Sequence, residues 1–505
     1  MKTVKYLALL SAGVSLAACG GGGTTAPAPL VAAPPPPPVT QAPTPTTAVG
    51  PISGFGSVIV NGVRYNTDTA SFIINGETGT QDDLGVGSYV IVEATVDSSG
   101  NATAQSVKYN DAVQGPISSI DTVNNRMVVL GQTVIIDGNT SFDSQITPRS
   151  LLGLAVGDNV EISGTGDADG NIIASRIERE PANSEFEVRG IVSNLDTNAR
   201  TFQINQLTVD YSQAVLEDFG TNVLANGLLV DAEGTNFNNA DTLIATKVEY
   251  EGEEGRDDDS VGNENDEAEI EGIVTEFSSS SSFKISGVPI ITNASTRYEY
   301  GTATDIALNV RLEAEGTYNA NQVLVAEEIE FKNRSSSSGD SSNDSNIKVE
   351  TTLDAVNTAT NLITIFGVDF EVDASTRYED DSRANLRTFG LSNLAAGDYL
   401  EIKGYDRGGS TLYASKIERD DPEAENESEI EAPVESFTSE SLIILGVTVS
   451  TNANTRYEDA NDNNLSRTAF FNQLRVGDLV EAEGTKTGAR ALTARELSIE
   501  LPDDD

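Results

Sequence analysis

An internal repeat constrains this sequence more than any local feature does. The tetrapeptide Gly-Pro-Ile-Ser at positions 50–53 returns, in full or in part, further along the chain. Later copies begin at Gly115, Gly190 and Gly272, and degenerate copies begin at Thr351 and Ala432. Recurrence of this kind indicates one structural unit that is used repeatedly. A chain of 505 residues is also too long for one ordinary core, so we expect six related units.

Each unit presents the same features in the same order. Two short apolar strands flank a glycine that suits a tight hairpin, as at Gly131. A Thr-x-aromatic step follows, then a Gly-Asp turn such as Gly157-Asp158, and then a strand in which apolar and acidic residues alternate. A closing strand ends the unit. The order predicts about five short strands and little helix in each unit.

In an open sheet, the backbone N–H and C=O groups of the two edge strands would lack hydrogen-bond partners. Closure into a small barrel removes these edges. We therefore predict an all-β protein made of tandem small antiparallel β-barrels of OB-like shape, each enclosing its own apolar interior. A flat sandwich and an edge-to-edge array of sheets stay open as alternatives. The predicted repeats span 50–110, 112–180, 185–251, 268–333, 347–420 and 429–500.

Acidic or serine-rich stretches separate the later repeats. We predict an acidic linker at 252–267, within the very acidic region from Glu249 to Glu271, and another at 421–428. A serine-rich linker is predicted at 334–346. Segments of this composition bury little apolar surface and repel themselves, so we expect solvated connections between the barrels.

The N-terminus has the form of an export signal. A basic start at 1–5 leads into an apolar run at 6–16, which is too short for a permanent membrane span, and Leu16-Ala17-Ala18-Cys19 closes it. This ending resembles the lipobox of bacterial lipoproteins. The resemblance implies that residues 1–18 are a cleaved signal peptide, that Cys19 is the lipid attachment site, and that Gly20 favours the outer membrane. An ordinary secretory signal is the alternative.

Residues 19–49 are rich in glycine, then in proline, alanine and threonine, and are predicted to be a tether without a core. Polyproline II conformation stiffens much of such a segment, which gives a reach of roughly 60–90 Å. We expect the tether to hold the folded part clear of the bilayer. A ligand for a proline-recognition domain is the alternative reading of the same composition.

Composition limits the range of functions. The formal net charge of -48 makes nucleic acid an unfavourable partner, because a polyanion repels phosphate backbones. Histidine is absent, and the single cysteine lies in the leader, so the usual general base and the commonest ligands of transition metals are missing. We therefore predict a protein that is not an enzyme, and we assign no catalytic, metal-binding or cofactor-binding residue and no cofactor.

In their arrangement the units resemble the bacterial domain of unknown function numbered 5666. The residues of the second unit that fit its pattern are Gly115, Thr140, Phe142, Gly157, Asp158, Gly164, Ala174 and Ile177. The first unit has Ser88 in place of the turn aspartate, the third lacks a clean Thr step, and the fourth has Asn309-Val310 at the turn. The resemblance implies an envelope lipoprotein with repeated β domains and brings no known activity.

Four kinds of polar motif are candidate sites, and for each of them a structural role is favoured. The Gly-Asp turns satisfy local backbone amides, and the acidic pair Glu313 and Glu315 is expected on a solvated strand face. Two aspartate-rich loops, at 167–171 and 459–464, only partly match a calcium loop. The Thr-Arg-Tyr steps, which could stack sugars, are expected to pack and pair locally; they begin at Thr296, Thr376 and Thr455.

The first functional hypothesis is a non-enzymatic cell-envelope lipoprotein, held at the outer membrane by its lipid, whose string of β modules acts as a spacer, an adhesin or a scaffold for a polymer or protein. The expected partners are the membrane and a glycan or an envelope protein. The first alternative is a module whose acidic surface binds divalent cations such as Ca²⁺ weakly. The second is a glycan-active enzyme that uses carboxylates.

Overall fold

The computed structural model describes residues 43–182, 184–238, 242–252, 262–332, 347–407, 411–421, 427–460 and 463–500. The predicted signal peptide, Cys19 and most of the predicted tether lie outside these ranges. The serine-rich linker at 334–346 lies wholly outside them, as do residues 253–261 and 422–426 of the acidic linkers.

The second repeat has the barrel in its simplest form. Its strands are β8 (Val113–Asp121), β9 (Arg126–Val129), β10 (Gln132–Phe142), β11 (Asn159–Gly166) and β12 (Ile172–Glu180). Strand β8 pairs antiparallel with β9 and β11, β9 pairs with β10, β10 runs parallel to β12, and β12 pairs with β11. The ladder therefore closes on itself as a five-stranded barrel, which confirms the predicted all-β fold of small barrels.

The first, third and fourth barrels repeat this connectivity, with some strands split in two. The first contains β1 (Thr44–Gly54), β2 (Val58–Val60), β3 (Val63–Asn66), β4 (Ser71–Ile74), β5 (Glu77–Gly79), β6 (Tyr89–Val96) and β7 (Ala102–Tyr109). The third contains β13 (Phe186–Ile191), β14 (Ser193–Asp196), β15 (Thr201–Ile204), β16 (Leu207–Asp210), β17 (Val215–Glu217), β18 (Leu229–Gly234), β19 (Asn236–Asn238), β20 (Thr242–Ile244) and β21 (Lys247–Gly252). The fourth contains β22 (Glu267–Ser279), β23 (Ser282–Ile285), β24 (Val288–Ile291), β25 (Arg297–Glu299), β26 (Arg311–Tyr318) and β27 (Leu324–Phe331).

The last two barrels follow the same plan. The fifth contains β28 (Ile347–Thr352), β29 (Ala355–Asn357), β30 (Leu362–Ile365), β31 (Val368–Glu371), β32 (Arg377–Asp380), β33 (Tyr399–Tyr405) and β34 (Leu412–Asp420). The sixth contains β35 (Glu427–Phe437), β36 (Ser441–Ile444), β37 (Val447–Ser450), β38 (Arg456–Glu458), β39 (Leu479–Gly488) and β40 (Ala491–Ile499), with a short helix, α1 (Arg467–Gln473), between β38 and β39. Among the described residues, the helices are all too short or too polar to cross a membrane.

The glycine in the acidic strand of the second to sixth repeats has a steric reason, whereas the first repeat has Ala94 at this position. In β11 the pairing register shifts between Ser163 and Gly164, and a Cβ on Gly164 would lie 2.2 Å from the carbonyl oxygen of Ile173. Any side chain would therefore force the two central strands apart at this bulge. The corresponding glycines of the later repeats are equally close to a facing carbonyl: Gly234, Gly316, Gly404 and Gly484.

The turn and threonine motifs also have structural roles. Asp158 accepts a 2.9 Å hydrogen bond from the backbone N–H of Ala155, and Ser88 takes this role in the first barrel by accepting from Gly85 at 3.0 Å. The hydroxyl of Thr140 donates a 2.8 Å bond to the carbonyl of Ala174, which joins the third strand of the barrel to the fifth. Both motifs therefore stabilise the barrel, as predicted for the turns.

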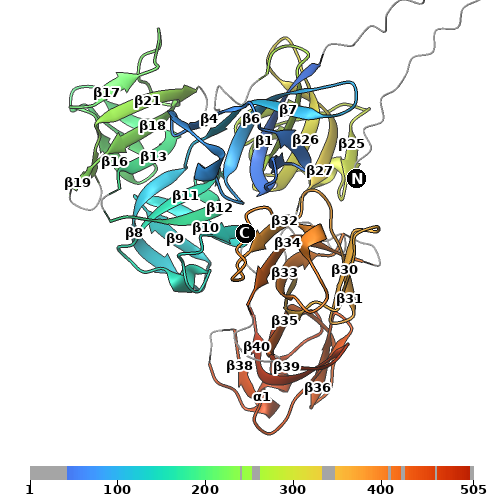
Figure 1. Cartoon of the computed structure of the whole chain (residues 1–505). Helices are drawn as coiled ribbons and strands as arrows, with labels where there is room; N and C mark the ends of the chain where they lie inside the picture. Colours follow the sequence, from blue (N-terminus) through green and yellow to red (C-terminus); the bar gives the residue numbers. More distant parts are fainter. Residues whose placement is uncertain are drawn as a thin grey trace, which may run out of the picture.

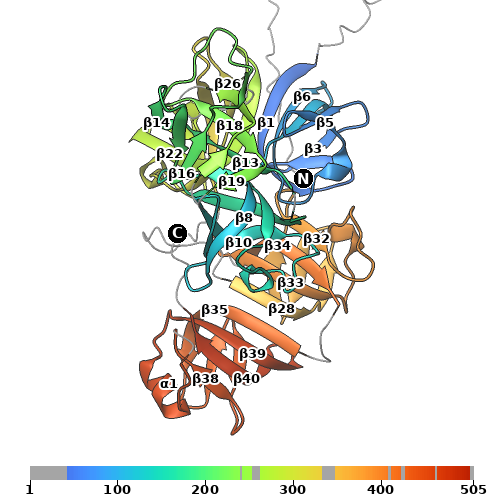
Figure 2. The same ribbon diagram turned by 90° about the vertical axis from the view of Figure 1, so that its left-hand side faces the viewer.

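The barrels join one another through their first strands. Strand β8 pairs antiparallel with β13, β28 pairs antiparallel with β35, and β1 pairs in parallel with β22. The first barrel thus pairs with the fourth, which is not its neighbour in the sequence. Figures 1 and 2 show the same arrangement, with the sixth barrel at one end of the molecule beside the fifth.

The prediction that each barrel encloses its own apolar interior is wrong for two pairs, and the cluster of the fourth barrel also includes Val49 and Ile91 of the first. One continuous cluster of buried side chains includes Val113 of the second barrel and Val188 of the third. Another includes Val349 of the fifth barrel and Ile430 of the sixth. The reason is the pairing of first strands, which brings the interiors of two barrels into contact across the shared ladder.

Two predicted boundaries also differ from the structure. Residues 44–49, predicted as tether, form the start of β1, because they pair with β6 on one side and β22 on the other. At the predicted solvated region between Glu249 and Glu271, β21 continues to Gly252 and β22 begins at Glu267. Acidic composition concealed these strand ends, since each glutamate alternates with a buried apolar residue.

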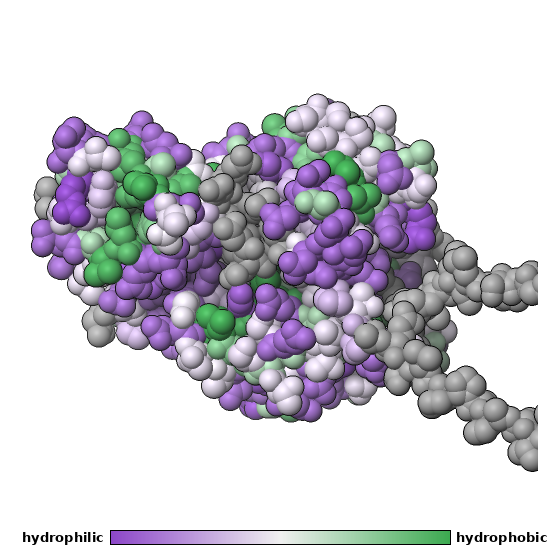
Figure 3. All heavy atoms as spheres, turned by 90° about the horizontal axis from the view of Figure 1, so that it is seen from above, coloured by the Kyte–Doolittle hydropathy of each residue, from purple (hydrophilic) through white to green (hydrophobic). Residues whose placement is uncertain are grey.

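On the face drawn in Figure 3, hydrophilic side chains cover most of the surface and hydrophobic ones form separate groups.

Candidate functional site

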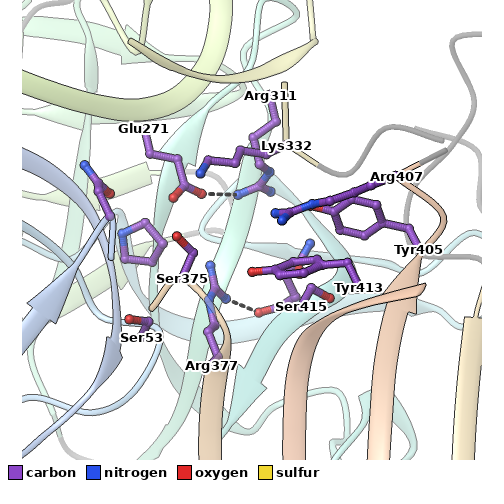
Figure 4. Close-up of a pocket in the computed structure, with 13 residues that line it drawn as sticks. Ser53, Glu271, Arg311, Lys332, Ser375, Arg377, Tyr405, Arg407, Tyr413 and Ser415 are labelled. Carbon is purple, nitrogen blue, oxygen red and sulfur yellow. Dashed lines mark hydrogen bonds and ion pairs between the residues drawn. The ribbon is translucent and has the colours of Figure 1, made fainter. Parts of the chain in front are cut away.

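A small, partly open cavity of about 40 Å³ lies where the first, second, fourth and fifth barrels meet. Figure 4 shows side chains from these barrels converging on it, with Arg377 on one side and Glu271, Arg311 and Lys332 on the other. The residues that line it are Pro51, Ser53, Asn61, Asn139, Glu271, Arg311, Lys332, Ser375, Arg377, Tyr405, Arg407, Tyr413 and Ser415. In a chain with a net charge of -48, four cationic side chains around one cavity are a notable concentration.

Lys332 is buried together with two carboxylates. Its ammonium lies 2.7 Å from a carboxylate oxygen of Glu313 and 3.0 Å from one of Glu330, and all three side chains are buried. Burial opposes the charge, but these carboxylates raise the pKa of Lys332 well above its usual value. Lys332 therefore stays positively charged at neutral pH.

Arg311 and Arg407 are both held in place by neighbouring side chains. Arg311 of the fourth barrel lies 2.8 Å from a carboxylate oxygen of Asp137 in the second barrel and 3.8 Å from one of Glu271. Arg407 lies 3.2 Å from a carboxylate oxygen of Asp373, and its guanidinium lies 3.3 Å from the centre of the Tyr413 ring. These contacts fix both guanidinium groups before any ligand arrives.

Arg377 differs from the other three cations. It is buried, and within the part of the chain that the structure describes it forms no ion pair. Its guanidinium donates a hydrogen bond to the backbone carbonyl of Asn139. Burial lowers the pKa of Arg377 below its usual value, and the neighbouring charge of Arg311 acts in the same direction, while Glu271 opposes it.

Two further donors at the cavity have no acceptor. The side-chain amide nitrogen of Asn139 and the Nε of Arg407 are buried and have no hydrogen-bond partner among the residues that the structure describes. A buried donor that lacks an acceptor costs about 1–3 kcal/mol, so a ligand that accepts from these groups would gain that energy. Together with Arg377 they form a set of donors suited to an oxyanion.

The three Thr-Arg-Tyr steps have different environments. All three threonine hydroxyls donate to an alanine carbonyl of the closing strand, as in the second barrel. Arg297 and Arg456 are mostly exposed, with 71% and 60% of the side chain accessible, and pair locally with Glu328 and Glu496. The prediction of local packing and pairing is therefore correct for the Thr-Arg-Tyr motifs that contain Arg297 and Arg456. The third motif differs, because its Arg377 lines the cavity.

The predicted solvated face holds for only one residue of the acidic pair in β26. Glu315 is exposed, whereas only 5% of the Glu313 side chain is accessible. The prediction is wrong for Glu313 because Lys332, at the end of β27, neutralises it inside the molecule. In the aspartate-rich loop at 167–171, Asp167 accepts hydrogen bonds from the backbone of Asp169 and Asn171, so its oxygens serve the loop itself.

A separate feature is a set of carboxylate triads, which sequence reasoning missed. In each of four groups, oxygens of three acidic residues lie within 4.8 Å of one another. The groups are Asp111, Glu187 and Asp231; Glu161, Glu178 and Glu180; Glu379, Asp381 and Glu418; and Glu429, Glu481 and Glu483. Their members come from different strands or different barrels, so only pairing and register bring them together.

The comparison with protein families agrees with the architecture. The model of the family described as "Domain of unknown function (DUF5666)" matches the chain in six segments: 47–108, 114–178, 189–249, 271–330, 350–418 and 431–498. The chain matches no curated protein. The six matched segments cover most of the sequence and each contains one barrel, and the chain therefore belongs to the DUF5666 family as a tandem array of six copies.

Proposed function

We propose that this protein is a non-enzymatic lipoprotein of the cell envelope, whose joined β-barrels form a scaffold that binds a polymer carrying acidic sugars. The observation that carries the proposal is the cavity between four barrels, with its cationic lining and its donors without acceptors. The lipobox-like ending at Cys19 and the proline-rich segment after it support an acylated, outer-membrane location with the barrels held away from the lipid.

The lining of the cavity supports an anionic ligand. A carboxylate or phosphate oxygen only accepts hydrogen bonds, and Arg377, Asn139 and Arg407 all offer donors there. Glu271 also lines the cavity and can accept from sugar hydroxyls. A sugar that bears one acidic group combines both kinds of contact.

The charge states of the lining support binding rather than acid–base catalysis. Burial raises the pKa of Tyr405 and of Tyr413, so both hydroxyls stay neutral, and Lys332 stays charged. These groups keep one protonation state across the neutral range, whereas a general acid or base works best with a pKa near the working pH.

The binding test uses the purified full-length protein and isothermal titration calorimetry. The probes are oligosaccharides that end in a uronic acid, in a sugar phosphate or in the neutral parent sugar. We expect binding of an acidic probe, no binding of the neutral one, and weaker binding at high salt. Equal binding of acidic and neutral probes, or no binding of any, would contradict the proposal, and release of shortened sugars would indicate an enzyme.

Arg377→Gln and Arg456→Gln form a matched pair of variants. Both change the arginine of a Thr-Arg-Tyr step, but only Arg377 lines the cavity. Loss of a charged hydrogen bond worth about 1.5–3 kcal/mol predicts roughly 10- to 100-fold weaker binding for Arg377→Gln, with Arg456→Gln unchanged. Asn139→Asp adds a negative charge at the same place and serves as a second variant. Labelling with palmitate, lost in Cys19→Ala, tests the anchor separately.

A further inference from the structure

One of the four carboxylate triads lies at the seam between the second and third barrels. Asp111 comes just before β8, Glu187 lies on β13, and Asp231 lies on β18. Only 0%, 6% and 4% of these residues, respectively, are exposed. Each offers an oxygen within 4.8 Å of the others, so three carboxylates converge in a space that water hardly reaches.

The other three triads contain a cationic side chain. Arg176 pairs with Glu178, Lys416 lies 3.0 Å from Glu418, and Lys348 lies 2.8 Å from Glu429. Among the described residues, Asp111, Glu187 and Asp231 form no ion pair. The nearby Arg189 instead lies 2.8 Å from a carboxylate oxygen of Glu251. Among the described residues, this triad is therefore the one whose carboxylates form no ion pair, although the nearby charge of Arg189 partly opposes the rise in the pKa of Asp111 and Asp231.

Four of the six oxygens of this triad also lack a hydrogen-bond donor among the described residues. They are both carboxylate oxygens of Asp111, the Oε1 of Glu187 and the Oδ1 of Asp231, and all four are buried. Asp111 is thus a fully buried, unpartnered side chain directed at two other carboxylates. Isolated buried charges cost so much that such a group must bind a proton or a cation. Burial, and then the neighbouring carboxylates, raise the pKa of all three residues well above their usual values when no cation is bound.

We propose that Asp111, Glu187 and Asp231 form a binding site for a hard divalent cation, with Ca²⁺ as the ion that fits best. Calcium prefers six to eight oxygen ligands, and three carboxylates can supply up to six oxygens. Softer metals are disfavoured because the site offers neither nitrogen nor sulfur. The site is distinct from the cationic cavity, which is lined by none of these residues.

At this position a bound cation would help to hold the second and third barrels together. The seam between β8 and β13 contains two residue pairs, Gln114 with Glu187 and Val113 with Val188. The equivalent seams contain three pairs between β28 and β35 and four between β1 and β22. A cation held by Asp111 on one side and by Glu187 and Asp231 on the other would strengthen the shortest seam.

The direct test is equilibrium dialysis of the purified full-length protein against radioactive Ca²⁺, after treatment with a chelator. We expect about one equivalent bound with a Kd below about 1 mM, above a weak background from the acidic surface, and a rise in the thermal midpoint. Mg²⁺ as a second probe should bind more weakly. If the wild-type protein binds no equivalent in this range, the three residues share protons and the proposal is wrong.

Variants locate the bound ion. Asp111→Asn and Glu187→Gln keep the shape of each side chain and remove its charge, so each should abolish the bound equivalent. Glu483→Gln is the matched control, because its triad already contains Lys348. Calcium binding that persists in both Asp111→Asn and Glu187→Gln, or that is lost in Glu483→Gln, would overturn the assignment.

Terbium luminescence gives an independent readout in the wild-type protein. The chain has no tryptophan, so only tyrosine or phenylalanine can sensitise Tb³⁺, and Tyr109 lies two residues before Asp111. We expect Tb³⁺ emission that Ca²⁺ displaces and that Tyr109→Phe reduces. Emission that Ca²⁺ cannot displace would count against a specific site.

Discussion

The hydroxyl of Tyr109 donates a 2.6 Å hydrogen bond to the carboxylate of Glu161, and this bond joins the last strand of the first barrel to β11 of the second. Burial raises the pKa of Glu161 from its ordinary value of 4.5 to about 7, although the bond from Tyr109 acts in the opposite direction. The junction between these two barrels therefore contains a carboxyl group that titrates near neutral pH.

This titration predicts a pH-dependent stability. The folded protein binds the proton of Glu161 more tightly than the unfolded chain does, so stability falls as the pH rises from about 4.5 to 7. Glu161→Gln resembles the protonated form and should remove about 2 kcal/mol of this fall. Urea unfolding at pH 5 and pH 8 measures the change in the free energy of unfolding, and Glu440→Gln, at an exposed position, is the control. Parallel pH profiles for wild type and Glu161→Gln would contradict the prediction.

Removal of the Lys332 ammonium should destabilise the protein strongly. Lys332→Met removes the ammonium that pairs with both Glu313 and Glu330 inside the molecule, which costs about 3–5 kcal/mol. Arg297→Met breaks an exposed pair in the same barrel and should cost less than about 1 kcal/mol. Chemical denaturation compares the two, and similar losses would show that Lys332 is not essential to the buried network.

A pair of glycine variants tests the contact between the first two barrels. Gly87 and Gly100 both have positive φ angles, of 89° and 82°, but only Gly87 faces another barrel. A Cβ at Gly87 would lie 2.3 Å from the carbonyl oxygen of Ser175, whereas one at Gly100 would meet nothing within 4 Å. Gly100→Ala should cost about 1–2 kcal/mol and Gly87→Ala clearly more, as measured by thermal unfolding. Equal costs would mean that the two barrels separate easily.

The shared core of the last two barrels predicts that they open together. Val349 of β28 faces Ile430 of β35 across the seam, and both are fully buried. Ile430→Ala should cost about 2–5 kcal/mol and should lower hydrogen-exchange protection in β33 as well as in β39. Leu312→Ala in the fourth barrel is the control and should spare both strands. Loss of protection in β39 alone would show that the fifth and sixth barrels are independent.

The sequence predicted the barrel much better than it predicted the assembly. Repeated motifs such as the Gly157-Asp158 turn and the Thr140 step have local roles, and local roles leave a visible pattern in every copy. The pairing of β1 with β22 leaves no such pattern. It depends on how edges of different barrels fit together, and the acidic composition near Glu267 suggested a linker instead of a strand.

Neither candidate site could be identified from the sequence, and the reason differs between them. Arg377 occurs in the same motif as Arg297 and Arg456, so only the contact between barrels makes it a cavity residue. Asp111 lies between two predicted repeats, where the sequence indicates only a connection, yet strand pairing places it against Glu187. The absence of histidine directed attention away from metal chemistry, although a site built only of oxygens needs none.

The parallel ladder between β1 and β22 also bears on how such a chain can evolve. Tandem repeats ordinarily gain and lose copies by duplication and deletion, and an open array tolerates the change because only neighbours touch. Here the first copy is bound to the fourth, with two copies in the loop between them. Deletion of the second or third copy would give the fourth a new position relative to the first. The contact between the first and fourth copies therefore limits the number of copies between them. New copies are best accommodated at the C-terminal end.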